Sequence, residues 1–201
     1  MKKLFLPLAT LILLSFTTND SSLTKSERKF AIEQFKNSKN HLLSAIKGLS
    51  EAQLNFKAGP ESWSIAECTE HIAITESALF GMFEGTLKQP ADPSKRSEVK
   101  MTDQQVMSLV TDRTTKVKTQ EPFKPTGKFG SHEGAVKEFV TKRDEHIKFI
   151  KETKDDLRDR YQQLPFGTID AYQLIIFISG HTERHIKQIE EVKANANFPK
   201  N

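Results

Sequence analysis

Two histidines four positions apart, near the C-terminal end of the chain, offer the clearest candidates for chemistry. His181 and His185 lie in a segment with helical periodicity, so their side chains project from one face on consecutive turns. They continue an apolar stripe through Leu174 and Phe177, which predicts that both rings face the core. An unpaired buried polar group costs about 1–3 kcal/mol, and one shared metal ion would satisfy both rings. Two hydrogen-bonded histidines at the core edge remain the alternative, because spacing alone does not separate the two interpretations.

The residues between the two histidines exclude one well-known mechanism. No glutamate follows His181 directly, so the segment lacks the glutamate base of the HExxH metalloprotease motif. Glu183 lies about 200° around the helix from His181 and is expected to point away from a metal held by the pair. Arg184 lies only about 60° off that face, where it either borders the site and attracts an anion or extends to solvent.

A third ligand must come from another helix, and His71 is the best candidate. It falls on the face of Cys68 and Thr75 in a second periodic segment, beside apolar positions. Glu67, one turn earlier, is placed to orient the His71 ring as a hydrogen-bond acceptor. Glu67 and Glu70 are also candidates for a general base by proximity alone, although a surface position is expected for Glu70.

His146 is the second choice for the third ligand, because it precedes Ile150 by one turn of a further helix. His41 and His132 occupy less regular positions and are expected at the surface. Three histidines with an open fourth position are typical of catalytic zinc sites, whereas structural zinc sites are usually closed by four ligands and rich in cysteine. The single cysteine, Cys68, is expected to be a small buried apolar residue, with a reactive thiol as the alternative.

Four long segments with helical periodicity must position these side chains. Hydroxyl residues followed by Glu or Gln three positions later predict several helix starts. The expected helices run from Thr24 to about Gly48, from Ser64 to about Leu87, from Ser131 through Ile150, and from Thr168 to about Ala194. A shorter helix is expected from Thr102 to about Val117, followed by a surface loop over 122–130. No run alternates with period two, so residues 162–167 are interpreted as a connector, and the fold class is all-α, an antiparallel four-helix bundle.

The first twenty residues are typical of a targeting segment. Lys2 and Lys3 precede an apolar run over 4–16, which is shorter than the roughly 20 residues of a membrane-spanning helix. A basic start, a short apolar core and a polar end favour a secretory signal peptide over residues 1–20, with an uncleaved N-terminal anchor as the alternative. The protein is therefore expected to be exported, to the periplasm or to the medium, and residues 21–201 form one domain.

The charge distribution excludes a typical nucleic-acid binder. The net charge is +4, of which Lys2 and Lys3 contribute two, and lysines and glutamates are interspersed on most segments. A nucleic-acid-binding domain would show a clustered basic stripe with aromatic platforms. The expected partner is a small-molecule substrate or ligand, with membrane contact only through an uncleaved N-terminal segment. A homodimer is left open.

Two motifs resemble those of the DinB-like superfamily. The stretch WSIAECTEHI at 63–72 resembles its second-helix motif, and GHTERHIKQI at 180–189 resembles its last-helix motif. The likeness extends over about residues 25–195. It implies a four-helix bundle with an open three-histidine site for a divalent metal ion, and the matching positions are His71, His181 and His185. Zinc, nickel and iron are the metals associated with the family.

The resemblance leaves the reaction open. Some members of the family are thiol S-transferases that join low-molecular-weight thiols to electrophiles, but those thiols belong mainly to the cytoplasm, and this chain carries an apparent signal segment. The first hypothesis is a metal-dependent enzyme of the hydrolase or thiol S-transferase type, in which the metal activates water or a thiol. The second is a non-catalytic binding module of the cell envelope, and the third is a structural domain whose histidines merely pack.

Overall fold

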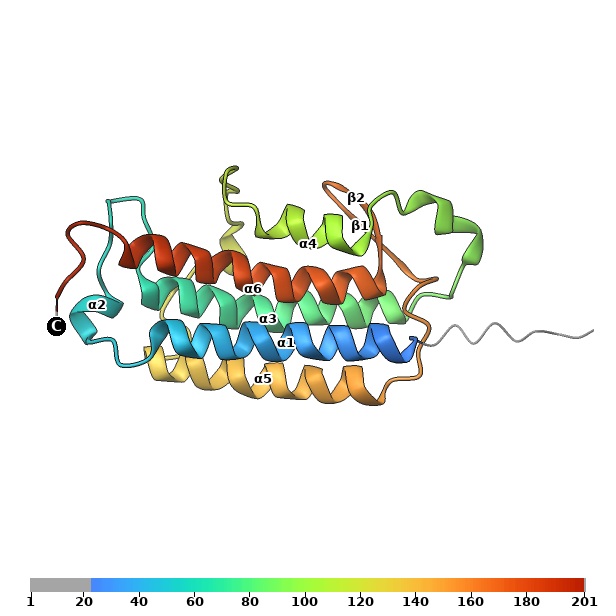
Figure 1. Ribbon diagram of the computed structural model, residues 1–201, viewed down its shortest axis with the longest axis horizontal. Helices are drawn as coiled ribbons and strands as arrows, with labels where there is room; N and C mark the ends of the chain where they lie inside the picture. The colour runs from blue at the N-terminus through green and yellow to red at the C-terminus, as the bar shows by residue number, and fades with distance from the viewer. Residues whose placement is uncertain (1–22, 201) are drawn as a thin grey trace, which may run out of the picture.

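Four long amphipathic helices form the frame of the molecule in the computed structural model, which describes residues 23–200 (Figure 1). They are α1 (Lys25–Ile46), α3 (Ile65–Leu87), α5 (His132–Glu152) and α6 (Ala171–Lys193). The prediction of an all-α four-helix bundle is therefore confirmed. A one-turn helix, α2 (Glu51–Leu54), lies in the connection between α1 and α3.

Side-chain caps decide where the long helices begin. Thr24 and Ser64 each accept a hydrogen bond from the backbone N–H three residues later, and the glutamate at that position bonds back to the cap. Ser131 also caps α5. Its side chain accepts a hydrogen bond from the Gly134 N–H, and there is no reciprocal side-chain bond. The last helix begins two residues later than predicted, because Asp170 rather than Thr168 is its cap. Each such cap contributes about 1 kcal/mol.

The connection from α3 to α5 is long because these two helices are parallel neighbours. Helices α1 and α6 run in one direction and α3 and α5 in the other (Figure 1). Each of α1 and α3 packs against both α5 and α6. The chain must therefore return along the whole bundle, about 1.5 Å for each helical residue, before α5 can start. The returning segment contains the short helices η1 (Pro93–Glu98), α4 (Asp103–Thr111) and η2 (Glu121–Phe123).

Helix α4 is shorter than predicted and packs across α6. It ends at Thr111 instead of continuing to Val117, because the Asp112 carboxylate accepts hydrogen bonds from Thr114 and stabilises a turn. Its contact with α6 lies at Gly180, where a Cβ atom would overlap the Val110 side chain. A glycine at this position therefore lets α4 approach α6 one residue before His181.

The connector between α5 and α6 is a β-hairpin, so the prediction that the chain has no strands is wrong here. Strands β1 (Tyr161–Leu164) and β2 (Gly167–Asp170) pair antiparallel around a turn at Pro165 and Phe166. Gly167 has φ of +133°, a backbone conformation that favours glycine. Strands of four residues give too little alternation to be recognised, and this pair is supported by contacts with distant parts of the chain.

A buried polar layer divides the apolar core into two clusters. One cluster contains Phe35, Ile150 and Leu174, and the other contains Leu42, Phe139 and Ile186. Between them lies Arg143, which is fully buried and donates to both carboxylate oxygens of Glu76, at 2.8 and 2.6 Å. Its remaining donors bond the Ser38 hydroxyl at 2.6 Å, the Phe35 carbonyl at 3.3 Å and the Thr182 hydroxyl at 2.7 Å. Arg143 on α5 thus connects all four long helices.

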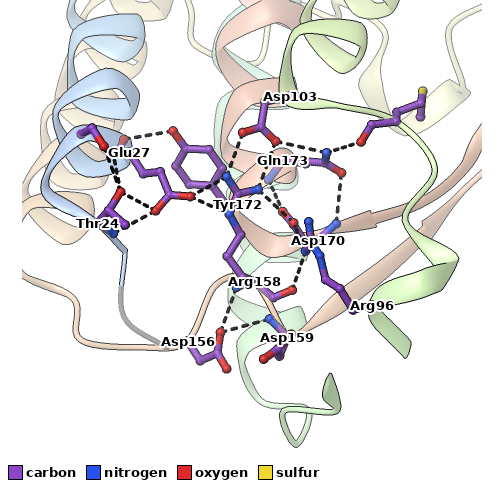
Figure 2. A network of polar contacts seen from close by, with 12 residues as sticks. Thr24, Glu27, Arg96, Asp103, Asp156, Arg158, Asp159, Asp170, Tyr172 and Gln173 are labelled. Atoms are coloured by element: carbon purple, nitrogen blue, oxygen red, sulfur yellow. Dashed lines mark hydrogen bonds and ion pairs between the residues drawn. The ribbon is translucent and has the colours of Figure 1, made fainter. Parts of the chain in front are cut away.

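A second charged cluster lies at the end of the bundle where α1, α4 and α6 begin (Figure 2). The Arg158 guanidinium lies 2.6 Å from Glu27, 2.8 Å from Asp103 and 3.0 Å from Asp170. It also stacks over the Tyr172 ring at 4.1 Å from the ring centre. One arginine therefore links three helix starts, and the site described below lies toward the other end of α6.

The predicted signal peptide falls on residues 1–20, outside the residues that the structure describes. Within residues 23–200, no helix combines the length and the apolar character that crossing a bilayer requires.

Candidate metal centre

The structure brings His71, His181 and His185 together between α3 and α6. One ring nitrogen from each histidine lies within 4.8 Å of the other two. The ring centre of His71 lies 5.2 Å from that of His181 and 4.3 Å from that of His185, and the ring centres of His181 and His185 are 4.6 Å apart. Nitrogens bound to a single zinc ion at about 2.0–2.1 Å lie roughly 3–4 Å from one another, so this cluster is close to a ligating arrangement.

Hydrogen bonds fix which nitrogen is free on the two most buried rings. His71 Nδ1 lies 2.7 Å from the Phe123 carbonyl oxygen, and His185 Nδ1 lies 2.9 Å from Gln188 Oε1. Both oxygens only accept, so each Nδ1 carries the proton and each Nε2 presents a lone pair. The Gln188 amide is oriented by Arg113, whose Nη1 donates to the same oxygen at 3.3 Å. Outer hydrogen bonds of this kind usually accompany metal-binding histidines.

The environment keeps all three imidazoles neutral. Burial lowers the pKa of His71, partly offset by its bond to the Phe123 carbonyl. Burial lowers the pKa of His181 to about 3, together with the repulsion that a protonated His181 would meet from His71, when that ring is also protonated, and from Arg184. Burial and the two other histidines hold the pKa of His185 well below its ordinary value. Metal ligation requires the deprotonated imidazole, and these rings hold that form at neutral pH without losing a proton.

His146, the second choice for the third ligand, is committed to the polar layer. Its Nδ1 lies 2.7 Å from Glu76 Oε1, and its ring stacks on Phe80 with centres 3.5 Å apart. It does not belong to the histidine cluster. His41 is partly exposed and contacts the Glu183 carboxylate at 2.8 Å. Glu183 therefore points away from the cluster, as its helical position predicts.

Glu67 does not orient His71, contrary to the prediction. Its carboxylate accepts from the Ser64 backbone N–H at 2.8 Å and from Lys57 Nζ at 2.7 Å, so it completes the cap of α3. The group that orients His71 is the Phe123 carbonyl, from the long crossover segment. A backbone carbonyl leaves no signal in the sequence, which is why side-chain spacing pointed to the nearest carboxylate instead.

Glu70 is buried, contrary to the expected surface position. Its carboxylate accepts from three successive backbone N–H groups, those of Thr126, Gly127 and Lys128, at 3.1, 3.0 and 2.7 Å. The loop that follows Phe123 is therefore bound to α3 directly beside His71. Glu70 and His71 hold the same segment, one through its N–H groups and the other through a carbonyl.

Arg184 does not extend to solvent, although its positive charge still acts on His181. Its side chain is buried and donates to the Thr115 carbonyl at 2.7 Å and the Val110 carbonyl at 3.5 Å. It fixes the end of α4 and the residues after it. The sequence suggested that Arg184 either attracts an anion or extends to solvent, and neither role is confirmed. The carbonyls that it bonds instead belong to the end of α4 and the turn after it, which spacing along α6 does not reveal.

Apolar side chains shield one side of the cluster. The Trp63 ring lies 4.9 Å from His71 and 6.2 Å from His185, and these two histidines are only 3% and 6% exposed. His181 is the most exposed of the three. Cys68 is fully buried and burial raises the pKa of its thiol to about 12, which favours the inert apolar role over the reactive thiol.

Comparisons with known proteins agree with this fold. A family model for the DinB superfamily matches residues 34–189, a range that contains all three histidines. The chain is 27% identical over 149 residues to the uncharacterized protein YuaE of Bacillus subtilis (strain 168), covering 74% of this chain and 88% of that protein. Its structure is similar to that of YfiT from Bacillus subtilis, with a TM-score of 0.57 and 16% identity over 89% of this chain and 92% of that chain. YfiT is described as a probable metal-dependent hydrolase with an unusual four-helix bundle topology.

Proposed function

Because the chain belongs to the DinB superfamily, we propose that it is a metal-dependent hydrolase in which His71, His181 and His185 hold one divalent ion. The observation that carries this proposal is the pair of Nδ1 hydrogen bonds, which place the proton of two buried, neutral histidines on Nδ1 and leave each Nε2 lone pair available to a metal ion. When bound, such an ion supplies Lewis-acid chemistry to a water molecule or to a carbonyl group. Three protein ligands leave a position open for either.

The protein's own residues hold and shield the site. The Phe123 carbonyl and Gln188 keep two rings in the tautomer that ligation needs, and Trp63 excludes water from the side that His71 and His185 face. Glu67 and Glu70 are withdrawn as general bases, because a helix cap and a loop occupy their oxygens. No second residue is assigned to proton transfer. Three imidazole ligands suit zinc, nickel and iron, and we propose an ion from this group.

Hydrolysis is preferred to thiol transfer for two reasons. YfiT is described as a hydrolase, and the N-terminal segment of this chain predicts export, away from cytoplasmic thiols. A non-catalytic binding module of the envelope would hold the same metal without turnover. Activity on a substrate panel therefore separates these functions, whereas metal content alone does not.

The test begins with the purified full chain, stripped of metal and then reloaded with zinc, nickel or iron. We expect about one ion per chain and metal-dependent turnover on a panel of carboxylic esters and amides, with no activity on a low-molecular-weight thiol and an electrophile. His181→Ala should lose both metal and turnover, and His41→Ala should retain both. Equal metal content in His181→Ala would contradict the site. Bound metal without turnover on any ester or amide would favour the binding module.

A further inference from the structure

An aromatic pair adjoins the most exposed histidine of the cluster. The ring centres of Phe177 and His181 lie 6.2 Å apart, and Phe166 stacks on Phe177 at 5.8 Å with an angle of 26° between the rings. Phe166 is 37% exposed. These aromatic side chains therefore form a continuous row from the histidine cluster to the surface.

The hairpin presents Phe166 in a fixed position. Phe166 occupies the turn between β1 and β2, where polar residues and glycine are the usual choice. The strands are tied by the bond from the Thr168 hydroxyl to Gln163 at 2.7 Å, and the hairpin is tied to α3 by the Thr86 hydroxyl, 3.1 Å from Gln162 Oε1. Turn chemistry therefore does not account for a half-exposed phenyl ring at this point.

The burial of the three histidines defines the side from which a ligand can approach. Trp63 packs beside His71 and His185, which are nearly inaccessible, whereas His181 is partly exposed. Phe177 lies beside His181, so an arm that extends from a molecule at His181 toward Phe177 would meet that ring and then Phe166. Binding sites for small molecules are lined mainly by apolar and aromatic side chains with a few polar groups.

The positive charge of Arg184 acts on His181 and disfavours a cationic substituent on that molecule. Arg184 lies about one turn after His181 on α6, and its guanidinium donates to the Thr115 and Val110 carbonyls. No charge is contributed by the aromatic pair itself. The row thus complements an uncharged apolar group.

We propose that Phe166 and Phe177 bind an aryl or alkyl group of the substrate while its hydrolysable group lies beside His181. This inference rests on the proposed function and narrows its substrate class to small esters or amides with an uncharged apolar arm, aromatic arms being bound most tightly. Stacking against two phenyl rings supplies the preference for an aryl group.

Two hydroxamates that differ only in the arm test this proposal. Benzohydroxamate and acetohydroxamate share one metal-chelating group, but only the first carries a ring. With the full chain loaded with Co(II), we expect benzohydroxamate to bind more tightly, and Phe166→Ala to weaken it about tenfold while leaving acetohydroxamate unchanged. The matched control is Phe30→Ala, which removes an equally exposed ring (40%) from α1 and should change neither affinity.

The outcomes distinguish the two levels of the proposal. An unchanged ratio of the two affinities in Phe166→Ala would overturn the role of the aromatic pair, and so would an equal loss of both hydroxamates. Phe166→Tyr keeps the ring and should restore the wild-type ratio. If the Co(II)-loaded wild-type protein binds neither hydroxamate, the open metal position fails, and the proposed function fails with it.

Discussion

Two groups of buried polar side chains flank α3, and they satisfy their polar atoms in different ways. In the polar layer, the donors of Arg143 reach Glu76, Ser38 and Thr182, and His146 bonds the same Glu76. In the histidine cluster, one nitrogen of each buried ring has a protein acceptor, and within residues 23–200 no hydrogen bond engages the Nε2 atoms of His71 and His185. The first group is built around a buried ion pair, whereas the second leaves the Nε2 lone pairs of His71 and His185 without a protein donor among the described residues.

The difference also shows in the charges that each region holds. Although burial by itself raises the pKa of the Glu76 carboxyl, the charge of Arg143 and the bond from His146 hold that pKa below its ordinary value. The histidine cluster is instead held neutral by burial. The polar layer therefore holds a paired charge, whereas the cluster holds neutral imidazoles, the form that binds metal ions. The predictions below separate the two regions by their effects on stability and on metal affinity.

The largest effect is expected from breaking the buried ion pair. Arg143→Met should lower the free energy of unfolding by about 3–5 kcal/mol, because Glu76 is left buried without its counter-charge. Urea denaturation measures the change. The double variant Glu76→Leu/Arg143→Leu should regain most of the loss, and Lys142→Met, beside Arg143 but on the surface, should leave the midpoint unchanged. A stable Arg143→Met protein would show that the layer contributes little.

The next largest effect is expected on zinc affinity, when a histidine of the cluster is compared with a histidine of the polar layer. His185→Ala should weaken zinc binding at least about 100-fold, since it removes a ligand rather than an outer contact, for which 10–100-fold is usual. Competition with a chromophoric chelator measures this. His146→Ala should do the opposite, with unchanged zinc affinity and reduced stability, because it removes a hydrogen bond to Glu76. Similar zinc affinities in both variants would erase the proposed distinction between the regions.

The metal-free protein should lose stability as the pH falls below about 6.5. The three cluster histidines have lowered pKa values in the folded state, that of His181 about 3. The unfolded chain therefore binds more protons between pH 6.5 and 3, and stability falls with pH by up to about 1.4 kcal/mol per pH unit for each histidine. Unfolding measured across this range should show a weaker slope in His181→Gln. An unchanged slope would mean that folding does not lower the pKa of His181.

The smallest effect is expected at Glu70, which acts on the site indirectly, through the loop that follows Phe123. Glu70→Gln replaces a carboxylate that accepts three backbone N–H bonds with a neutral amide. The loop should loosen, the Phe123 carbonyl should hold His71 less firmly, and zinc affinity should fall by less than about tenfold. The same chelator competition detects this change. Glu67→Gln is the control, and it should affect stability of the α3 cap but not zinc affinity.

The parts of this structure that the sequence predicts well depend on local spacing. The caps at Thr24, Ser64 and Ser131 and the helical face shared by His181 and His185 involve residues within four positions of one another. His71 is predicted from its place beside the apolar face of its helix and also matches the family motif, but no local rule predicts that α3 packs beside α6.

The missed features depend on contacts between residues far apart in the chain. Arg143 bonds residues from three other helices, and nothing near it in the sequence announces a buried charge. Glu70 is buried only because a distant loop folds onto it. The hairpin around Phe166 was interpreted as a connector, since its strands are too short to show a pattern and α3 helps to hold it.

The parallel arrangement of α3 and α5 has a consequence for the order in which the histidine cluster forms during folding. His71 emerges early, but the other two histidines belong to the last helix, which can dock only after the long crossover and α5 are in place. Contacts this distant in sequence form late in folding, because loop closure precedes any gain from them. A nascent chain that ends before α6 carries one histidine of the cluster and cannot retain the ion. Completion of the cluster would therefore coincide with the docking of α6, in whichever compartment the chain folds.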